Sequence, residues 1–475
     1  MNIIKNYVYN TAFQVFSVLF PLITSPILTR TLHSEALGVY SYTASIAQLF
    51  SSFGLLGLNL YSTREIAYVR ENERQCSQCF FELFSLRLIL SGVSLVVFLV
   101  MFYNSEYAEI IFYQALIFIV NAVDVSWLYG GKERFKELTI RGFLVKLFGL
   151  ALIVICVRTP KDLISYIAIM LGSSLLGNIL LAINIKKIMP IFPVEKLKLR
   201  RYIRPSVKLF LPQIATQIYL YTDKIMIEQL CQNISELAYY DQAERIVKIP
   251  VCFVTSLSTV LMPSISNAVK QNNKKIVDEY TALAIGYNMM LTIPIIFGMD
   301  AVAPQFIPWF LGEEFSSCVW LIQLMSPVLL FIALTSVTGN QYMISLNMTR
   351  ELTISYGGAA IVNVVLNLIL IPKLGGMGAA IGTVFAEFTV FCIQVYFTRQ
   401  AVHIKQHLSS GVRYIIAGGI MYWIITYIDN LASGIMGFIV SVIVGAIIYG
   451  ICLWGMGDPH IKAAILWIIQ KEKKI

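Results

Sequence analysis

The chain has 475 residues, of which 57% are hydrophobic and 13% are charged, and its formal net charge is +9. Soluble domains carry roughly a quarter charged residues, so a soluble fold of this composition would expose large apolar patches. The charges gather in short segments between apolar runs of about 20 residues, the length of a helix that crosses the hydrocarbon core. Lipid requires every backbone polar group to be satisfied internally, and no alternating ten-residue strand pattern is present. The composition therefore predicts an all-α polytopic membrane protein.

The apolar runs predict fourteen transmembrane helices in chain order. The expected helices are 7–29, 38–60, 83–103, 108–129, 142–157, 163–185, 208–230, 237–262, 281–299, 318–343, 352–372, 376–398, 414–429 and 433–455. We expect the first run to be a span and not a cleaved signal, because only Lys5 precedes it and no small-residue cleavage site follows it.

The basic residues predict the orientation of these helices. With the amino terminus inside, the inner segments hold 29 Lys and Arg residues and the outer segments hold 4. Basic residues resist translocation, so both termini are expected in the cytoplasm. The positive charge lies where the topology requires it, and we therefore expect no nucleic-acid partner.

An internal repeat suggests two lobes. Leu37–Ile46 and Leu237–Ile246 share Leu, Tyr and Ile at three aligned positions, and both open a helix that enters from outside. The repeat is therefore parallel, with an axis along the membrane normal. The predicted organisation is two pseudo-symmetric six-helix lobes, a linker between them and two additional helices. The boundaries are 1–185 for the N-lobe, 186–207 for the basic cytoplasmic linker, 208–399 for the C-lobe, and 400–475 for helices 13 and 14 with the tail.

Charged side chains inside predicted spans need a partner or a watery cavity. The candidates among them are Asp124, Asp223, Lys224, Glu228, Asp241, Glu244, Arg245, Lys248 and Glu387. Lys248 lies about eleven residues into its helix, roughly 16 Å deep and close to the bilayer midplane. Spacings of four allow the pairs Lys224–Glu228, Asp241–Arg245 and Glu244–Lys248.

Two interpretations of this cluster stay open. The pairs could neutralise one another and join the two helices. Alternatively, their cations line a central cavity and bind an anionic substrate, because guanidinium and ammonium groups in a low dielectric are good partners for phosphate. Glu387, the lone acid of its helix, is either a proton-coupling site or a buried hydrogen-bond partner.

Other features have structural interpretations beside functional ones. Pro21 and Pro26 are expected to bend or break the first helix before Arg30, which could snorkel to the outer headgroups. Trp127 and Tyr129 fit an interfacial aromatic belt. The glycines between 375 and 382 predict a tight turn and close helix packing.

The cysteines and histidines predict no metal site or other cofactor. Cys76 and Cys79 form a C-x-x-C without a second pair, and His403 and His407 have no further ligands nearby.

Four segments together resemble a known family. They are Pro26–Tyr40, Asp124–Phe135, Asp223–Ile246 and Gly378–Glu387. Their order and spacing are similar to those of the bacterial oligosaccharide flippases of the Wzx type, in the superfamily that also holds multidrug and toxin extruders and the lipid II flippase. In the family pattern Arg30 matches the arginine that closes helix 1, and Asp223 matches the acid of helix 7. Lys224, Arg245 and Lys248 are candidates from depth and spacing.

The resemblance implies a transporter and not an enzyme. The substrate would be a polyprenyl-diphosphate-linked oligosaccharide, flipped across the bacterial cytoplasmic (inner) membrane for O-antigen, capsule or a similar polymer. Arg30, Lys224, Arg245 and Lys248 would bind it in a central cavity. Asp124, Asp223, Glu228 and Glu387 would be cavity acids or would couple transport to H⁺ or Na⁺. Membrane lipid, a polysaccharide polymerase and a chain-length regulator are the expected partners.

Two alternatives differ in what they require. A multidrug antiporter shares the architecture but needs an acidic and aromatic cavity for cationic drugs. A membrane polymerase or glycosyltransferase needs a larger loop or domain, and the sequence shows no nucleophile–base or metal constellation.

Overall fold

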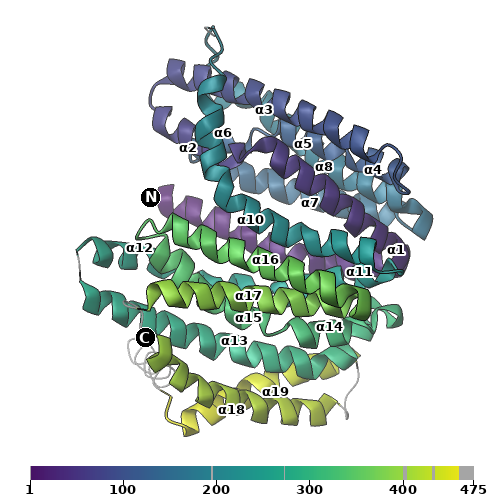
Figure 1. The fold of residues 1–475 in the computed structure, drawn as a ribbon, viewed down its shortest axis with the longest axis vertical. Helices are drawn as coiled ribbons and strands as arrows, with labels where there is room; N and C mark the ends of the chain where they lie inside the picture. Colours follow the sequence, from purple (N-terminus) through teal and green to yellow (C-terminus); the bar gives the residue numbers. More distant parts are fainter. Residues whose placement is uncertain (1, 194–195, 272, 400–403, 430–433, 459–475) are drawn as a thin grey trace, which may run out of the picture. The chain divides into compact units, whose positions relative to one another are not determined.

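The computed structural model describes residues 2–193, 196–271, 273–399, 404–429 and 434–458. The chain forms two compact units, Met1–Ala238 (unit 1) and Tyr239–Ile475 (unit 2). Figure 1 shows the described chain as a series of helices, with unit 1 in purple to teal and unit 2 in teal to yellow. The expected all-α membrane architecture is confirmed.

The predicted spans agree with the helices. Among the described residues, 11 stretches are long and apolar enough to cross a membrane. The first of them, Phe16–Val69, overlaps the predicted spans 7–29 and 38–60, and the others each overlap one. The prediction 208–230 lies within the helix Arg200–Leu230, whereas 237–262 is divided between two helices, Ser235–Lys248 and Val251–Lys270. About fourteen spans therefore fit the structure.

Unit 1 contains the first ten α-helices. They are α1 (Asn2–Leu55), α2 (Leu58–Val69), α3 (Glu73–Phe102), α4 (Ala108–Gln114), α5 (Leu116–Val123), α6 (Ser126–Gly131), α7 (Phe135–Cys156), α8 (Leu163–Ile183), α9 (Ile185–Ile188) and α10 (Arg200–Leu230), with the 3₁₀ helix η1 (Pro160–Asp162) before α8. The helix α1 packs along α3, α7 and α10. A buried apolar cluster joins α2, α3, α6 and the start of α10.

The division between the units falls later than the predicted linker. Because α10 packs on α1 and α2, it belongs to unit 1, and the boundary lies between Ala238 and Tyr239. The assignment of lobes at residues 186–207 stays a prediction.

The backbone of α1 leaves helical geometry at His33, which has φ 60° and ψ 178°. Pro21 and Pro26 lie inside the helix before that point, so they do not break it. That they bend it stays a prediction. The hydroxyl of Thr24 donates to the carbonyl of Phe20 at 3.3 Å, which illustrates how side chains support the backbone near a membrane proline.

Unit 2 contains the rest of the chain. Its helices are α11 (Ser235–Lys248, which starts at the unit boundary), α12 (Val251–Lys270), α13 (Lys274–Leu311), the 3₁₀ helix η2 (Glu313–Phe315), α14 (Cys318–Met325), α15 (Val328–Thr335), the π-helix η3 (Ser336–Met343), α16 (Thr349–Leu374), α17 (Gly376–Thr398), α18 (Ile404–Asp429) and α19 (Gly434–Gly455). Its main buried cluster joins α13 to α18 and α19.

The glycine-rich turn between α16 and α17 is confirmed as a packing feature. Gly375 has φ 58° and ends α16, and α17 returns beside it (Figure 1). A Cβ on Gly378 would lie 2.5 Å from the carbonyl carbon of Leu370, and one on Gly382 would meet the side-chain oxygen of Asn367. Glycine at these positions is what allows the two helices to approach so closely.

The aromatic belt predicted for Trp127 and Tyr129 was wrong, because both side chains are buried. The indole nitrogen of Trp127 donates to the carbonyl of Asp124 at 2.9 Å, and the hydroxyl of Tyr129 donates to the carbonyl of Leu181 at 2.8 Å. Both rings belong to the apolar cluster of unit 1.

Candidate functional site

The eight predicted site residues are divided between the units. Unit 1 contains Arg30, Asp124, Asp223, Lys224 and Glu228. Unit 2 contains Arg245, Lys248 and Glu387. That they meet in one cavity stays a prediction.

Two of the three predicted ion pairs are present, both on α11. The guanidinium of Arg245 lies 2.9 Å from Asp241, and the ammonium of Lys248 lies 2.5 Å from Glu244. The carboxylates are the buried members, at 2% and 10% exposed, while the cations are 35% and 32% exposed. Each cation thus neutralises a buried acid on its own helix and still presents part of its side chain outward.

The three charged residues near the end of α10 are buried or half-buried. Asp223 is buried and Lys224 is half-buried. Glu228 is hydrogen-bonded by the hydroxyl of Tyr42 from α1. This contact joins α10 to the part of α1 that follows the bend at His33. The pair Lys224–Glu228 remains a prediction.

Arg30 is exposed near the end of the first part of α1, one turn before the bend at His33. Glu387 is half-buried in α17 and lies close to Tyr356 of α16. The choice between coupling and a hydrogen-bonding role for Glu387 therefore stays open.

Asp124 has a defined structural position between α5 and α6. Its backbone is extended, and its carboxylate accepts hydrogen bonds from the backbone nitrogen and the hydroxyl of Ser126, both at 2.9 Å. The same carboxylate lies 3.5 Å from the guanidinium of Arg87. Asp124 thus accepts the backbone N–H of the first residue of α6 and is the counter-ion of a buried arginine.

Sequence reasoning missed Arg87 as an intramembrane charge and assigned it to an inner loop. In the structure it lies well inside α3 and is 1% exposed. Besides Asp124, it donates to the carbonyl of Asn121 at 2.5 Å and to the side-chain oxygen of Asn59 at 2.7 Å. Its position inside the predicted span 83–103 was the signal that could have identified it.

Lys146 was missed in the same way, since it lies in the predicted span 142–157 but was counted with an inner segment. The helix α7 begins earlier than predicted, at Phe135. Its ammonium group lies over three rings of α1, at 5.6 Å from Phe13, 5.9 Å from Phe16 and 5.1 Å from Phe20. It is half-buried about eleven residues into the helix, roughly 16 Å from its start. It is therefore a midspan cation held by aromatic faces.

Unit 2 also contains hydrogen-bonded pairs of uncharged polar side chains. Asn363 and Asn367 of α16 are buried, and the Asn367 amide donates to the Asn363 oxygen at 3.3 Å. On neighbouring elements, Thr338 donates to Gln394 at 2.6 Å and the hydroxyls of Tyr240 and Thr383 lie 2.9 Å apart. Hydropathy along the sequence does not reveal these residues, since isolated amides barely change an apolar average.

The predicted C-x-x-C belongs to the apolar core of unit 1. Cys76 and Cys79 are buried in the apolar cluster of unit 1. His403 falls outside the described residues, and the side chain of His407 is not described. Within the described ranges, no three His, Cys, Asp or Glu side chains are grouped in a way that could hold a metal ion.

Comparisons with known proteins agree with this architecture. A family model described as "Polysaccharide biosynthesis protein" matches residues 3–269, and a second, "Lipid II flippase MurJ", matches residues 150–445. The chain is 23% identical over 419 residues to a protein of Escherichia coli (strain K12) named "Putative O-antigen transporter", covering 83% of this chain and 96% of that protein.

Two solved structures share the fold. The lipid II flippase MurJ in an inward closed conformation aligns with TM-score 0.66 and 16% identity, over 94% of this chain and 98% of its own. An inward-facing multidrug resistance transporter of the MATE family aligns with TM-score 0.64 and 14% identity, over 84% and 96%.

The fold and these matches define a multi-pass membrane protein of the superfamily that unites multidrug, oligosaccharidyl-lipid and polysaccharide exporters. Within it, the chain belongs to the polysaccharide biosynthesis protein family, and the expected resemblance to Wzx-type flippases is confirmed.

Proposed function

We propose that the protein flips polyprenyl-diphosphate-linked oligosaccharide repeat units across the bacterial cytoplasmic membrane, for O-antigen, capsule or a similar surface polymer. The observation that carries the proposal is the pair of family matches, which together extend from residue 3 to residue 445. The similarity to the O-antigen transporter named above supports the same substrate class.

The charges of α10 and α11 support the proposed binding step. A diphosphate needs cations in a low-dielectric site, and Arg30, Lys224, Arg245 and Lys248 are the proposed group. The partial exposure of Arg245 and Lys248 is consistent with this role, because each keeps surface available beyond its own ion pair.

The mechanism we propose is alternating access. The cavity opens to the cytoplasm, the cations hold the diphosphate while the lipid tail stays in the bilayer, and movement of the lobes exposes the site outside. A proton or sodium gradient resets the cycle through a carboxyl group such as Asp223 or Glu387. Transport into sealed vesicles that is unchanged when both gradients are collapsed would contradict the coupling step.

The test is the accumulation of lipid-linked oligosaccharide in a deletion strain, complemented with wild type or with variants present at equal membrane levels. Removing Lys248 alone takes away the ion-pair partner of the buried Glu244, which damages folding as well as binding. The informative variant is therefore Glu244→Gln with Lys248→Gln, which removes the cation without stranding the acid. Its matched control is Lys248→Arg, which preserves the charge.

The expected result is that wild type and Lys248→Arg clear the intermediate and the paired neutral variant does not. Clearance by the neutral variant would remove Lys248 from the site while leaving the function intact. If nothing accumulates in the deletion strain and surface polymer is normal, the flippase proposal is wrong. Drug-resistance profiling of that strain then tests the multidrug antiporter.

A further inference from the structure

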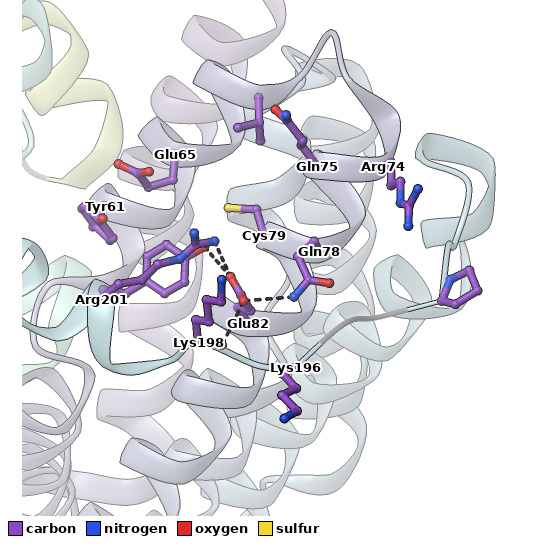
Figure 2. Close-up of a pocket in the computed structure, with 13 residues that line it drawn as sticks. Tyr61, Glu65, Arg74, Gln75, Gln78, Cys79, Glu82, Lys196, Lys198 and Arg201 are labelled. Carbon is purple, nitrogen blue, oxygen red and sulfur yellow. Dashed lines mark hydrogen bonds and ion pairs between the residues drawn. The ribbon is translucent and has the colours of Figure 1, made fainter.

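A polar cavity of about 570 Å³ lies in unit 1, and none of the residues proposed for transport is among those that line it. Its walls come from α2, from the first half of α3, and from the chain that leads into α10 (Figure 2). The volume is in the range of sites that take small ligands or headgroups.

The cavity is a built feature because two hydrogen bonds hold the chain before α10 against α3. The backbone nitrogen of Phe192 donates to the hydroxyl of Ser77 at 3.2 Å. The backbone nitrogen of Lys198 donates to the carboxylate of Glu82 at 2.9 Å. The side chains that follow these anchors are therefore held beside the cavity.

Glu82 is the centre of this arrangement and is only 1% exposed. It accepts from the guanidinium of Arg201 at 2.5 Å, the hydroxyl of Tyr202 at 2.7 Å and the amide of Gln78 at 3.0 Å. Figure 2 shows Arg201 and Gln78 directed at Glu82 from opposite sides. Burial, and then the hydrogen bond to Glu82, raise the pKa of Tyr202, so its hydroxyl stays protonated and donates.

The charge of the lining is positive. Four basic residues line the cavity, Arg74, Lys196, Lys198 and Arg201, against two acids, Glu65 and Glu82. The charge of Glu82 is taken up by Arg201, and Glu65 lies 3.7 Å from the guanidinium of Arg64 on the same helix. Lys196 and Lys198 are exposed, so their ammonium groups can reach a ligand. The lining therefore favours an anion.

The surroundings indicate where that anion comes from. The excess of basic residues places this end of unit 1 on the cytoplasmic side under the positive-inside rule. Large apolar side chains within two positions of lining residues in the sequence are exposed, with Tyr68 at 72% and Ile191 and Leu197 both at 47%. Basic groups beside exposed apolar groups suit the headgroup level of a bilayer, where basic pockets bind anionic lipids.

We propose that this cavity binds a phosphate-bearing headgroup from the cytoplasmic leaflet, with Lys196 and Lys198 as the main phosphate contacts and the Glu82 cluster as their support. The proposal does not depend on the transported substrate, since it concerns residues outside the proposed transport group.

The experiment uses the full-length protein in nanodiscs of phosphatidylcholine, with and without phosphatidylglycerol, and measures bound phosphatidylglycerol by native mass spectrometry after mild detergent release. The variant is Lys196→Gln with Lys198→Gln, which keeps the backbone bond from residue 198 to Glu82. The matched control is Lys186→Gln with Lys187→Gln, which removes the same charge from exposed residues of α9 outside the cavity.

The expected result is retained phosphatidylglycerol on wild type and on the control, and a loss on the order of tenfold or more in the Lys196/Lys198 variant. If both variants lose phosphatidylglycerol equally, the lipid binds through general surface charge, and the proposed site is wrong. Equal retention of phosphatidylcholine and phosphatidylglycerol by wild type would overturn the phosphate chemistry.

A competition experiment distinguishes a lipid headgroup from a soluble phosphate compound as the ligand. Inorganic phosphate and glycerol 3-phosphate are added to the phosphatidylglycerol-loaded wild type. We expect these compounds not to displace phosphatidylglycerol at concentrations comparable to that of the lipid. The exposed apolar side chains can contact the acyl chains of a lipid, whereas a soluble phosphate compound has no apolar part for them to bind. Full displacement of phosphatidylglycerol would show that the cavity binds a soluble phosphate compound. The proposal that its ligand is a lipid of the cytoplasmic leaflet would then be wrong. All of these measurements detect lipid binding and none requires transport, so the headgroup proposal is tested independently of the flippase proposal.

Discussion

The ammonium nitrogen of Lys146 lies 3.5 Å from the carbonyl oxygen of Ser17, the acceptor that the N–H of a non-proline residue at position 21 would bond. Pro21 has no N–H, so the carbonyl four residues earlier loses its intrahelical donor. A lysine from α7 therefore supports the backbone of α1 at this point, while three phenylalanine rings of α1 surround its charge.

This relationship predicts coupling between Lys146 and Pro21. We expect Lys146→Met to lower the free energy of unfolding by about 1–3 kcal/mol, because the Ser17 carbonyl is left without a donor and the cation–π contacts are lost. In a Pro21→Ala background the restored N–H bonds that carbonyl, so the same substitution should cost about 1 kcal/mol less. Unfolding in mixed micelles with increasing SDS measures all four proteins of the cycle. Strict additivity would show that the two residues act independently.

The buried arginine of α3 predicts a second, larger effect. Arg87→Ala should destabilise the protein by about 3–5 kcal/mol. Asp124 would lose its ion-pair partner, and the carbonyl of Asn121 and the side-chain oxygen of Asn59 would lose a donor. The amount of monodisperse protein after extraction, read by size-exclusion chromatography, gives the result. Arg134→Ala is the matched control, since Arg134 is 54% exposed in its pair with Glu137. Similar yields for the two variants would contradict a structural role for Arg87.

The hairpin of α16 and α17 predicts a contrast between two glycines. Gly378→Ala should cost about 3 kcal/mol or more, because its Cβ would lie 2.5 Å from the backbone of Leu370 and the helices would have to separate. Gly357→Ala, in α16 where a Cβ meets nothing within 4 Å, should be neutral or stabilising by up to about 1 kcal/mol. Thermal unfolding of the purified variants compares them. A well-folded Gly378→Ala protein would show that the close approach is not required.

The Glu82 cluster predicts a change in protease sensitivity. Glu82→Gln removes the charge and replaces one acceptor oxygen with a donor, so the segment before α10 should be released from α3. Tryptic cleavage at Lys196 and Lys198 should then become several-fold faster in detergent-solubilised protein. Glu71→Gln serves as the control, because Glu71 is 90% exposed beside Arg70. Cleavage at an unchanged rate would mean that the segment is held by other contacts.

Local sequence determined the membrane architecture. The spacing of apolar runs placed the spans correctly, as for 318–343 and 376–398, because the length and hydropathy of a segment are properties of that segment alone. The i, i+4 pairs of α11 were predictable for the same reason, since both partners lie on one helix. The family could also be identified from the order of short motifs.

Tertiary structure decided what each side chain contacts. Lipid tails are as apolar as a protein core, so hydropathy could not distinguish the buried Trp127 and Tyr129 from residues of an aromatic belt. Nor could it show that the partners of Arg87 and Lys146 lie on other elements. The donor that α7 supplies to the Ser17 carbonyl, where Pro21 removes one, was equally invisible in the sequence of α1. These are contacts between segments far apart in the chain, and only the packed helices bring their atoms together.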